Sequence, residues 1–355
     1  MRLSGNRGEW SELYALIKLL CLGRLYAADE KVERIENLYF PILRVLRNPN
    51  TEQQIDFLVR DDVVEVLCSG ESVSKLSKTT LSRMSRLLYT GIYLGSDRAF
   101  EIEGAYDCMK ELHIDRISAP STDKTDITLQ IHDVFTGYDP ICGFSIKSEL
   151  GSPPTLLNAS KSTNFVYEIS GITDDDMRRI NSIDTRTKIL DRIKEIQKCA
   201  NLKYVRTQND VFASNLMLVD SFMPDIIAAM LLDFYQNKAT DCRSLVELLE
   251  KNDPIGYRRD GIYEYKFKKF LCSVALGMMP STKWNGHDEA NGGYVIVKKD
   301  GDVLAYHLYN RDAFETYLLN NTRLERASTT RHDFAVVYKN DNSFFVNLNL
   351  QVRFK

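Results

Sequence analysis

The sequence lacks the long apolar runs that mark membrane proteins and secreted precursors. The longest apolar stretch, residues 15–22, is interrupted by Lys18 and falls well short of the roughly 20 residues that a membrane helix needs. The first nine residues contain no hydrophobic segment of a secretory signal. We therefore expect a protein without membrane contact.

Cysteine is present but forms no recognisable pattern. The seven cysteines are an odd number, are scattered along the chain and include no CxxC pair. This spacing argues against a disulfide framework and against a zinc site. We expect free thiols, as in proteins of the reducing cytoplasm.

The chain also lacks an excess of charge of either sign. It has 46 basic and 49 acidic residues among 355, a net charge of −3, which excludes a polycationic nucleic-acid coat. A local basic surface would still be enough for nucleic-acid binding. With 44% hydrophobic and 27% charged residues, the chain can bury a large core. Its length suggests about two domains, or one large core with insertions.

Helical periodicity is the main signal in the first third of the chain. Leu13, Leu16, Ile17 and Leu20 follow helical spacing, which predicts helix over residues 9–47 with Asn6 or Ser11 as its cap. Residues 51–116 are expected to form shorter helices, with breaks near 69–70 and 95–96 and a helix over 99–112. Further helices are expected over 174–200, twice within 210–250, and over 262–277.

Strands are expected where polar and apolar residues alternate. Residues 126–132 and 143–148 alternate and are separated by turn-forming residues at 136–140, which predicts a hairpin with a long turn. A further strand is expected at 164–169. The pair Asp300-Gly301 predicts a hairpin of 293–297 and 303–308, and residues 340–342 separate another pair, 334–338 and 344–354.

The first hairpin carries the polar groups most suited to chemistry. Folding about residue 137 would place Asp126 opposite 147–148 and so next to Lys147, with Asp133 and Asp139 nearer the turn. A carboxylate can bind Mg²⁺, and a lysine can orient a water or stabilise charge on a phosphate. The pair therefore suits phosphodiester hydrolysis, although a surface salt bridge across the hairpin is the simpler interpretation.

Asp126 with Ser145-Ile146-Lys147 resembles the D…(D/E)xK core of the PD-(D/E)XK nucleases. More narrowly, the chain resembles the HpaII-type restriction endonucleases. The stretches that carry this resemblance are Gly143-Phe144-Ser145-Ile146-Lys147-Ser148, residues 150–160, Gly8-Glu9-Trp10-Ser11-Glu12-Leu13-Tyr14, Thr329-Thr330-Arg331-His332, and residues 348–354.

The resemblance implies an α/β (α+β) fold of the PD-(D/E)XK restriction-endonuclease-like type. Such a fold has a mixed central sheet flanked by helices, here with helical and β-rich extensions. The resemblance also implies a type II restriction endonuclease that makes Mg²⁺-dependent double-strand cuts in DNA at the palindrome CCGG. The cut would follow the first cytosine and leave 5′-phosphate ends, and methylation of the site would block it. A cognate cytosine DNA methyltransferase is then the expected functional partner, and a palindromic target is cut either by a twofold symmetric homodimer or in two successive events by a monomer.

Ser145 departs from the superfamily pattern, which has an acidic residue at this position. Serine is a poor metal ligand, so we expect another carboxylate to complete the site. Glu12 is the first candidate, Glu149 the second, and Glu101 and Glu103 are weaker ones. Each could instead be a solvated glutamate. Gln130, on the strand face of Asp126, is predicted to hold a metal-bound water or a phosphate, or simply to fill the polar face.

Two segments carry a local charge of +3 and are expected to contact DNA, residues 257–269 and 320–355. Arginines that read guanine and acidic groups that accept from cytosine are the groups that CCGG requires. Solvated charged loops are the alternative. The predicted DNA-binding residues are Arg258, Arg259, Arg323, Arg326, Arg331, His332 and, near the cut, Lys161, with Glu325 and Asp333 as possible cytosine partners.

Two alternative functions remain open. One is a nicking or repair nuclease of the same superfamily, and the other is a non-catalytic DNA-binding protein on a decayed nuclease fold, which Ser145 would favour. We expect residues 1–170 to form a helical region with the catalytic hairpin. Residues 171–355 would complete the core and contact DNA, unless the chain is a single domain.

Overall fold

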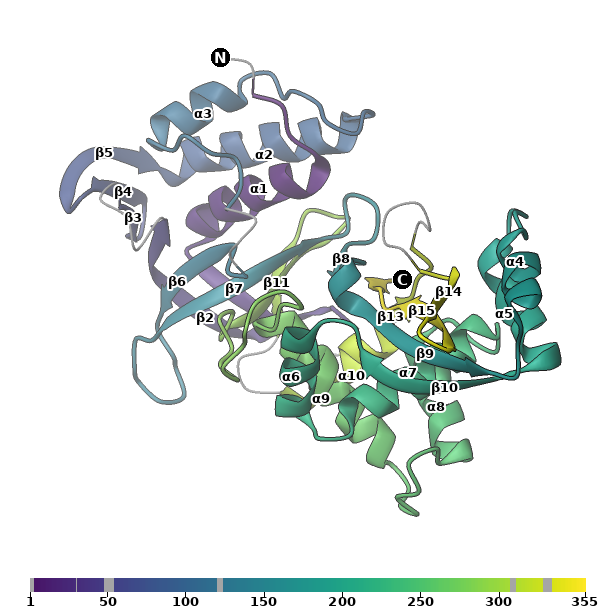
Figure 1. Cartoon of the computed structure of the whole chain (residues 1–355). Helices are drawn as coiled ribbons and strands as arrows, with labels where there is room; N and C mark the ends of the chain where they lie inside the picture. Colours follow the sequence, from purple (N-terminus) through teal and green to yellow (C-terminus); the bar gives the residue numbers. More distant parts are fainter. Residues whose placement is uncertain (1–2, 30, 48–53, 120–123, 307–310, 328–333) are drawn as a thin grey trace. The chain divides into compact units, whose positions relative to one another are not determined.

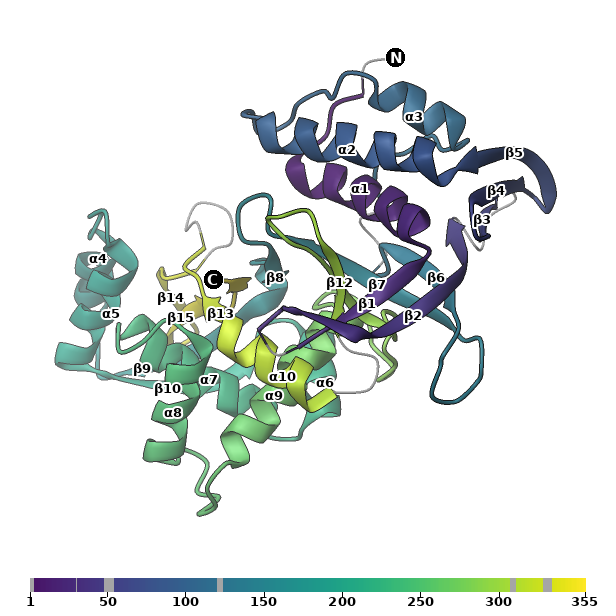
Figure 2. The same cartoon turned by 180° about the vertical axis from the view of Figure 1, so that it is seen from behind.

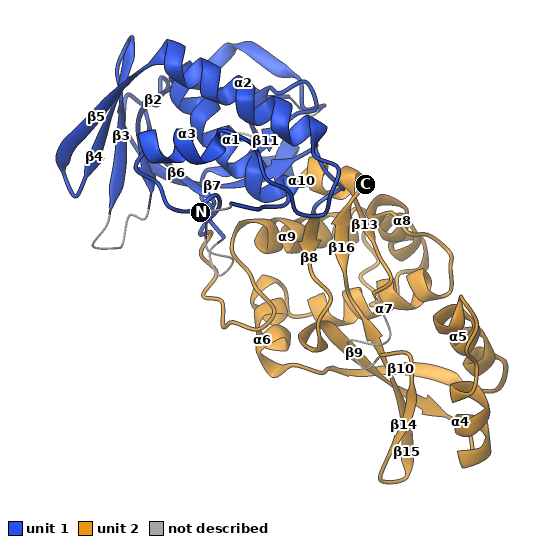
Figure 3. Ribbon diagram, turned by 90° about the horizontal axis from the view of Figure 1, so that it is seen from above, with its two compact units in different colours: residues 1–154, 289–314 blue, residues 155–288, 315–355 orange. Residues whose placement is uncertain are grey.

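The chain is described by a computed structural model that covers residues 3–29, 31–47, 54–119, 124–306, 311–327 and 334–355 (Figure 1). It consists of two compact units (Figure 3). Unit 1 combines residues 1–154 with 289–314, and unit 2 combines residues 155–288 with 315–355. The division at residue 170 stays a prediction, because the compactness of two units does not show that either folds by itself.

Unit 1 is built on a mixed sheet of nine strands among the described residues, in the order β1-β12-β11-β7-β6-β2-β3-β4-β5. β11 runs parallel to β7 and β1 runs parallel to β12, while the other neighbours are antiparallel. β1 also pairs with β2, so six strands form a closed circuit of pairings. The strands are β1 (Arg24–Ala28), β2 (Arg34–Arg47), β3 (Ile55–Val59), β4 (Val63–Cys68), β5 (Glu71–Ser77), β6 (Ile127–Ile131), β7 (Ile141–Ser148), β11 (Gly293–Val297) and β12 (Val303–Tyr306).

Helix α1 (Arg7–Leu22) is the central helix of unit 1. It packs against β7 and other strands, and α2 (Lys78–Leu94) packs on it, as Figures 1 and 2 show from opposite sides. Asn6 and Glu9 form a capping box at its start, which confirms Asn6 as the cap. The predicted stripe Leu13, Leu16 and Ile17 is buried. α3 (Ala105–Glu111) packs in turn against α2.

The prediction of helix over residues 9–47 is wrong beyond Leu22. Gly23 adopts a left-handed conformation (φ 65°), and its amide donates a hydrogen bond to the Leu19 carbonyl. This cap ends the helix. The chain then forms β1 and the 14-residue β2. β2 pairs with β1 through its first half and with β3 and β6 through its second. These pairings join distant segments, and local periodicity does not report them.

The prediction of several helices over 51–116 is also wrong in its first half, where β3, β4 and β5 lie. Val64 and Val66 are buried at alternate positions of β4, and this alternation is typical of a strand. The break near 69–70 is the tight turn between β4 and β5, with Ser69 at φ 50° and Gly70 at φ 88°. The second predicted break is correct, since α2 ends at Gly95.

Unit 2 contains two smaller sheets, one of four strands in the order β10-β9-β15-β14 and one of three in the order β13-β16-β8, among the described residues. Helix α10 (Arg311–Asn321) begins in unit 1 and continues into unit 2. The strands of unit 2 are β8 (Thr155–Leu157), β9 (Asn164–Ser170), β10 (Asn201–Thr207), β13 (Thr322–Leu324), β14 (Val337–Asn340), β15 (Ser343–Asn349) and β16 (Val352–Phe354). Its helices are α4 (Asp174–Asn181), α5 (Lys188–Cys199), α6 (Asp210–Val219), α7 (Met223–Tyr235), α8 (Cys242–Asn252) and α9 (Ile262–Leu276), with a short turn of 3₁₀ helix at Lys161–Thr163.

Several expectations for the second half of the chain are confirmed. They include the strand at 164–169, the helix near 262–277, the β11–β12 hairpin and the pairing of β14 with β15. The helix expected over 174–200 is two helices, the two expected within 210–250 are three, and α10 was not predicted. Residues 307 and 308 of the predicted second strand lie outside the described residues.

No single helix in the described part of the chain has the length and apolar composition to cross a membrane. Helices α6 and α7 pass this test only when counted together as one pair, bent by 105°. All seven cysteines are free, as predicted.

Candidate active site

The hairpin of β6 and β7 sets the position of Asp126. Ile127 pairs with Phe144 and Gln130 with Ile141, so Asp126 lies beside Ser145. The Asp126 amide also donates to the Phe144 carbonyl at 2.9 Å. The prediction that Asp126 lies opposite 147–148 is therefore wrong by about two residues.

The turn of this hairpin explains the difference in register. The Asp133 amide donates to the Tyr138 carbonyl, and the Asp133 carboxylate accepts from the Phe135 amide at 2.9 Å and from the Thr136 hydroxyl at 2.6 Å. These hydrogen bonds place the middle of the turn before Gly137, because the Asp133 side chain bonds to residues that follow it in the turn. Asp133 is thus a turn-forming residue, as its distance from Asp126 in sequence suggested.

Ser145 links the two charged side chains of the hairpin. Its hydroxyl Oγ donates to Asp126 Oδ2 at 3.0 Å and accepts from Lys147 Nζ at 2.8 Å. The Ile146 amide also donates to Asp126 Oδ2, at 2.6 Å. Asp126 and Lys147 therefore lie on one side of the hairpin, at one end of it, with a single hydroxyl between them.

Helix α1 brings Glu12 to the same place. The buried Ser11 donates its hydroxyl to the Arg7 carbonyl at 2.7 Å, within the helix, and its Oγ lies 2.8 Å from Ser148 Oγ on β7. Glu12 follows directly, and its Oε2 accepts from the Ala119 amide at 2.9 Å. The helix is thus held against β7 at the residue that precedes Glu12.

The pKa of Glu12 reflects the charged side chains of the hairpin beside it. The pKa of Glu12 is raised from 4.5 to about 8, chiefly by burial and in addition by the neighbouring Asp126. The Ala119 hydrogen bond and the cations Arg47 and Lys147 lower this pKa only in part. Two carboxylates therefore share a partly buried site in which both cannot ionise easily without an added positive charge.

Three side chains near this site were not predicted, namely those of Lys124, Tyr294 and Arg47. Burial lowers the pKa of Lys147, and it lowers the pKa of Lys124 to about 8, where the nearby Lys147 contributes. Lys147 Nζ also lies 5.1 Å from the ring centroid of Tyr294, which pairs with Ser145 across the parallel strands β7 and β11. Arg47, at the end of β2, completes the set. Sequence spacing gave no signal for these contacts.

Two of the predicted hairpin residues lie elsewhere. Glu149 is exposed just beyond β7, where its amide donates to the Val297 carbonyl at 2.9 Å. The Gln130 side chain donates to the Asp139 carbonyl at 3.4 Å, near the turn and four residues along the strand from Asp126. The structure does not bring either side chain to the Asp126–Lys147 pair.

The weaker carboxylate candidates are also peripheral. Glu101 and Glu103 are exposed on the segment that precedes α3, and neither is among the charged groups that chiefly set the pKa of Glu12. Of the four glutamates considered, Glu12 is the one that the structure places beside Asp126.

The donor set suits a hard divalent cation that keeps most of its waters. In the part of the chain that the structure describes, no cluster of three or more Asp, Glu, His or Cys side chains could hold a metal ion. Mg²⁺ is commonly bound by one or two carboxylates together with substrate phosphates and water. The raised pKa of Glu12 beside Asp126 is the feature that a bound cation would relieve.

The predicted DNA-binding residues are spread over unit 2. Arg323 lies on β13 and interacts with Glu325 at 3.5 Å, and Glu325 also pairs with Arg353 at 3.0 Å. Arg326 donates to Asn237 Oδ1 at 2.9 Å.

The other predicted DNA-binding residues lie on exposed segments. Arg258 and Arg259 are exposed between α8 and α9, and Lys161 is exposed in the 3₁₀ turn. Arg331, His332 and Asp333 lie outside the described residues.

Comparison with known proteins supports the resemblance over almost the whole chain. The sequence model of the HpaII restriction endonuclease family matches residues 6–354. The type II restriction enzyme HpaII of Haemophilus parainfluenzae is 39% identical over 356 residues, which cover 99% of this chain and 98% of the relative. No solved structure matches. The chain therefore belongs to the HpaII restriction endonuclease family, and the prediction that it is an endonuclease is confirmed.

Proposed function

We propose that the protein is a type II restriction endonuclease that cuts both strands of DNA at CCGG, after the first cytosine, and leaves 5′-phosphate ends. The observation that carries this proposal is the group formed by Asp126, just before β6, with Ser145 and Lys147 on β7 and Glu12 on α1. The target sequence comes from the family resemblance. The 39% identity to the HpaII enzyme over nearly the full length supports it.

In this proposal each side chain has a defined task. Asp126 and Glu12 would hold Mg²⁺, which supplies positive charge to a phosphate and lowers the pKa of a water when it is bound. Lys147 would orient the attacking water and stabilise the negative charge that develops on the phosphate. Ser145, which donates to Asp126 and accepts from Lys147, would keep the carboxylate and the ammonium at a fixed separation.

The proposal extends to the fold and the partners. The mixed sheet with the Asp126–Lys147 hairpin and α1 supports a PD-(D/E)XK core. A palindromic target favours a twofold symmetric homodimer on DNA, because each half-site then meets an identical subunit. A cognate cytosine methyltransferase would protect the host, and the free cysteines are compatible with work in the cytoplasm.

Digestion of a plasmid of known sequence tests the function directly. With Mg²⁺ we expect discrete fragments whose ends map to CCGG, and with EDTA in place of Mg²⁺ we expect no cleavage. Plasmid methylated at its CCGG sites serves as the control substrate and should resist. Single-strand nicks or cuts only at damaged bases would instead indicate a nicking or repair nuclease, and binding without cleavage would indicate a decayed nuclease.

A further inference from the structure

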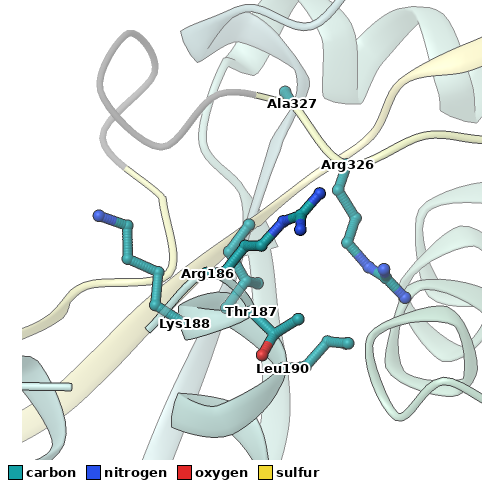
Figure 4. A pocket seen from close by; sticks show the side chains of 7 residues that line it. Arg186, Thr187, Lys188, Leu190, Arg326 and Ala327 are labelled. Carbon is teal, nitrogen blue, oxygen red and sulfur yellow. The ribbon is translucent and has the colours of Figure 1, made fainter. Parts of the chain in front are cut away.

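Unit 2 contains a pocket of about 300 Å³, and none of its lining residues is assigned to catalysis. Figure 4 shows it at the start of α5, beside the residues that follow β13. Three of the seven lining side chains are cationic and none is acidic. The lining residues are Arg186, Thr187, Lys188, Ile189, Leu190, Arg326 and Ala327.

The charges of two of these cations are not balanced by a carboxylate that the structure shows. Lys188 Nζ pairs with Asp184 at 2.7 Å, and in Figure 4 it extends away from the two arginines. Arg186 is exposed, and no ion pair with it is found among the described residues. Arg326 hydrogen-bonds only the neutral Asn237, and its buried Nε has no hydrogen-bond partner among the described residues.

Arg326 is held in place before any ligand arrives. Its guanidinium carbon lies 5.3 Å from the ring centroid of Phe234, a cation–π contact, and its Nη2 donates to Asn237 Oδ1. A guanidinium fixed in this way loses little conformational freedom on binding an anion. In Figure 4, Arg186 points across the pocket toward the side on which Arg326 lies.

The first turn of α5 adds the positive end of the helix dipole, which favours an anion, but it also carries the carboxylate of Asp191. Thr187 is its N-cap residue, but its hydroxyl donates to Asp191 at 3.0 Å and makes no capping bond to the helix amides. Thr187, Lys188, Ile189 and Leu190 all line the pocket, so the positive end of the helix dipole adjoins it.

We propose that this pocket binds a phosphate group of the DNA backbone, with Arg186 and Arg326 as its ligands. The inference rests on the proposed function, because it takes duplex DNA as the substrate. It assigns Arg326 to the backbone rather than to a guanine. Backbone contacts carry no sequence information, so the pocket serves affinity and position on the duplex, and not recognition of CCGG.

Binding of fluorescent duplexes without Mg²⁺, measured over a series of salt concentrations, tests this inference. Arg186→Ala is expected to weaken binding about tenfold, equally for duplexes with and without CCGG. The slope of log affinity against log salt should fall by about 0.9 for the lost phosphate contact. Arg186→Lys, which keeps the charge, should recover most of the affinity.

Arg178→Ala is the matched control, because this substitution also removes one positive charge from unit 2. Arg178 is exposed on α4 and already pairs with Asp175, so we do not expect it to bind a phosphate. It should leave the slope unchanged. Retained DNA binding with an unchanged slope in Arg186→Ala would refute the phosphate site alone, and so would a loss confined to CCGG duplexes. Stabilisation by inorganic phosphate that Arg186→Ala removes, without an effect on DNA, would also refute it. Wild-type protein that neither binds nor cuts DNA would refute the proposed function itself.

Discussion

Ser145 distinguishes the proposed site from the PD-(D/E)XK pattern, which has an acidic residue at this position. A carboxylate at this position would lie about 3 Å from Asp126, where the Ser145 hydroxyl now donates a hydrogen bond at 3.0 Å. Two such carboxylates repel each other unless a cation lies between them. With serine on β7, the second carboxylate that we propose for the site is Glu12 on α1, and the Ser145 hydroxyl joins Asp126 and Lys147 in one hydrogen-bond network.

The first prediction at this scale concerns the two charged residues of the hairpin. Asp126→Ala and Lys147→Ala should each lower the rate of plasmid cleavage by about 10²-fold or more, since in the proposed mechanism each side chain supplies a charge needed at the phosphate. DNA binding should survive in both variants, as measured by fluorescence anisotropy. Asp139→Ala, on the same hairpin but near its turn, should cleave normally. Full activity in either site variant would contradict the assignment.

The second prediction follows from the pKa of Glu12. Because this pKa is raised from 4.5 to about 8, the folded protein holds a proton between these pH values that the unfolded chain has lost. The free energy of unfolding of the metal-free protein should therefore fall as the pH rises through this window.

Glu12→Gln cannot ionise and should not show this loss. Relative to the variant, the wild type should lose about 1–3 kcal/mol of stability between pH 5 and pH 9, by urea denaturation. This figure is discounted from the full pKa difference, because water reaches part of the site. Adding Mg²⁺ at pH 8 should stabilise the wild type more than the variant. Parallel pH profiles of the two proteins would contradict the prediction.

The residues of the site were predictable to different degrees. Asp126 and Lys147 follow from alternation and turn chemistry within 22 residues of chain, and the resemblance supplied Glu12. Lys124, Arg47 and Tyr294 did not follow from any pattern. Tyr294 reaches Lys147 only because β11 pairs with β7 in parallel, a contact between distant segments that periodicity cannot report.

At the scale of elements, predictions succeeded where local chemistry decides the structure. The capped helix at 7–22 and the hairpins around 133–138 and 298–302 depend on caps and turns that a few neighbouring residues determine. Predictions failed for β2, β3 and β4, whose stability comes from pairing with one another and with β6. Apolar spacing alone was compatible with helix in this part of the chain.

The turn of the β6–β7 hairpin leads to a prediction at this scale. Asp133→Ala removes the bonds to the Phe135 amide and the Thr136 hydroxyl, and it should cost about 1–2 kcal/mol in urea denaturation. Because this turn sets the register that places Asp126 beside Ser145, cleavage should also fall. Asp139→Ala, at an exposed position paired with His132, is the control and should change neither quantity by much. Equal stability of the two variants would refute a structural role for Asp133.

At the scale of the whole molecule, unit 1 is assembled from both parts of the sequence. β11 and β12 come from residues 293–306, and they insert between β7 and β1 of the nine-stranded sheet. Val295 and Val297 on β11 belong to the same buried core as α1 and β7. The site is therefore supported by a segment that follows most of unit 2 in the chain.

A fragment of residues 1–170 should consequently be neither stable nor active, although it contains Glu12, Asp126 and Lys147. Without β11, strand β7 loses its parallel partner along Ser145, Ile146 and Lys147. We expect no cooperative thermal transition by circular dichroism and no plasmid cleavage, and the full chain serves as the control. A cooperative melt with cleavage by the fragment would contradict this account.

The late arrival of β11 also bears on the safety of the host cell. During translation the ribosome releases all the proposed catalytic side chains long before it completes the strand that lies beside them. A nascent or prematurely ended chain would thus carry the chemical groups of a nuclease without the framework that aligns them. For an enzyme that cleaves DNA, we expect this order of synthesis to delay activity until β11 has been made.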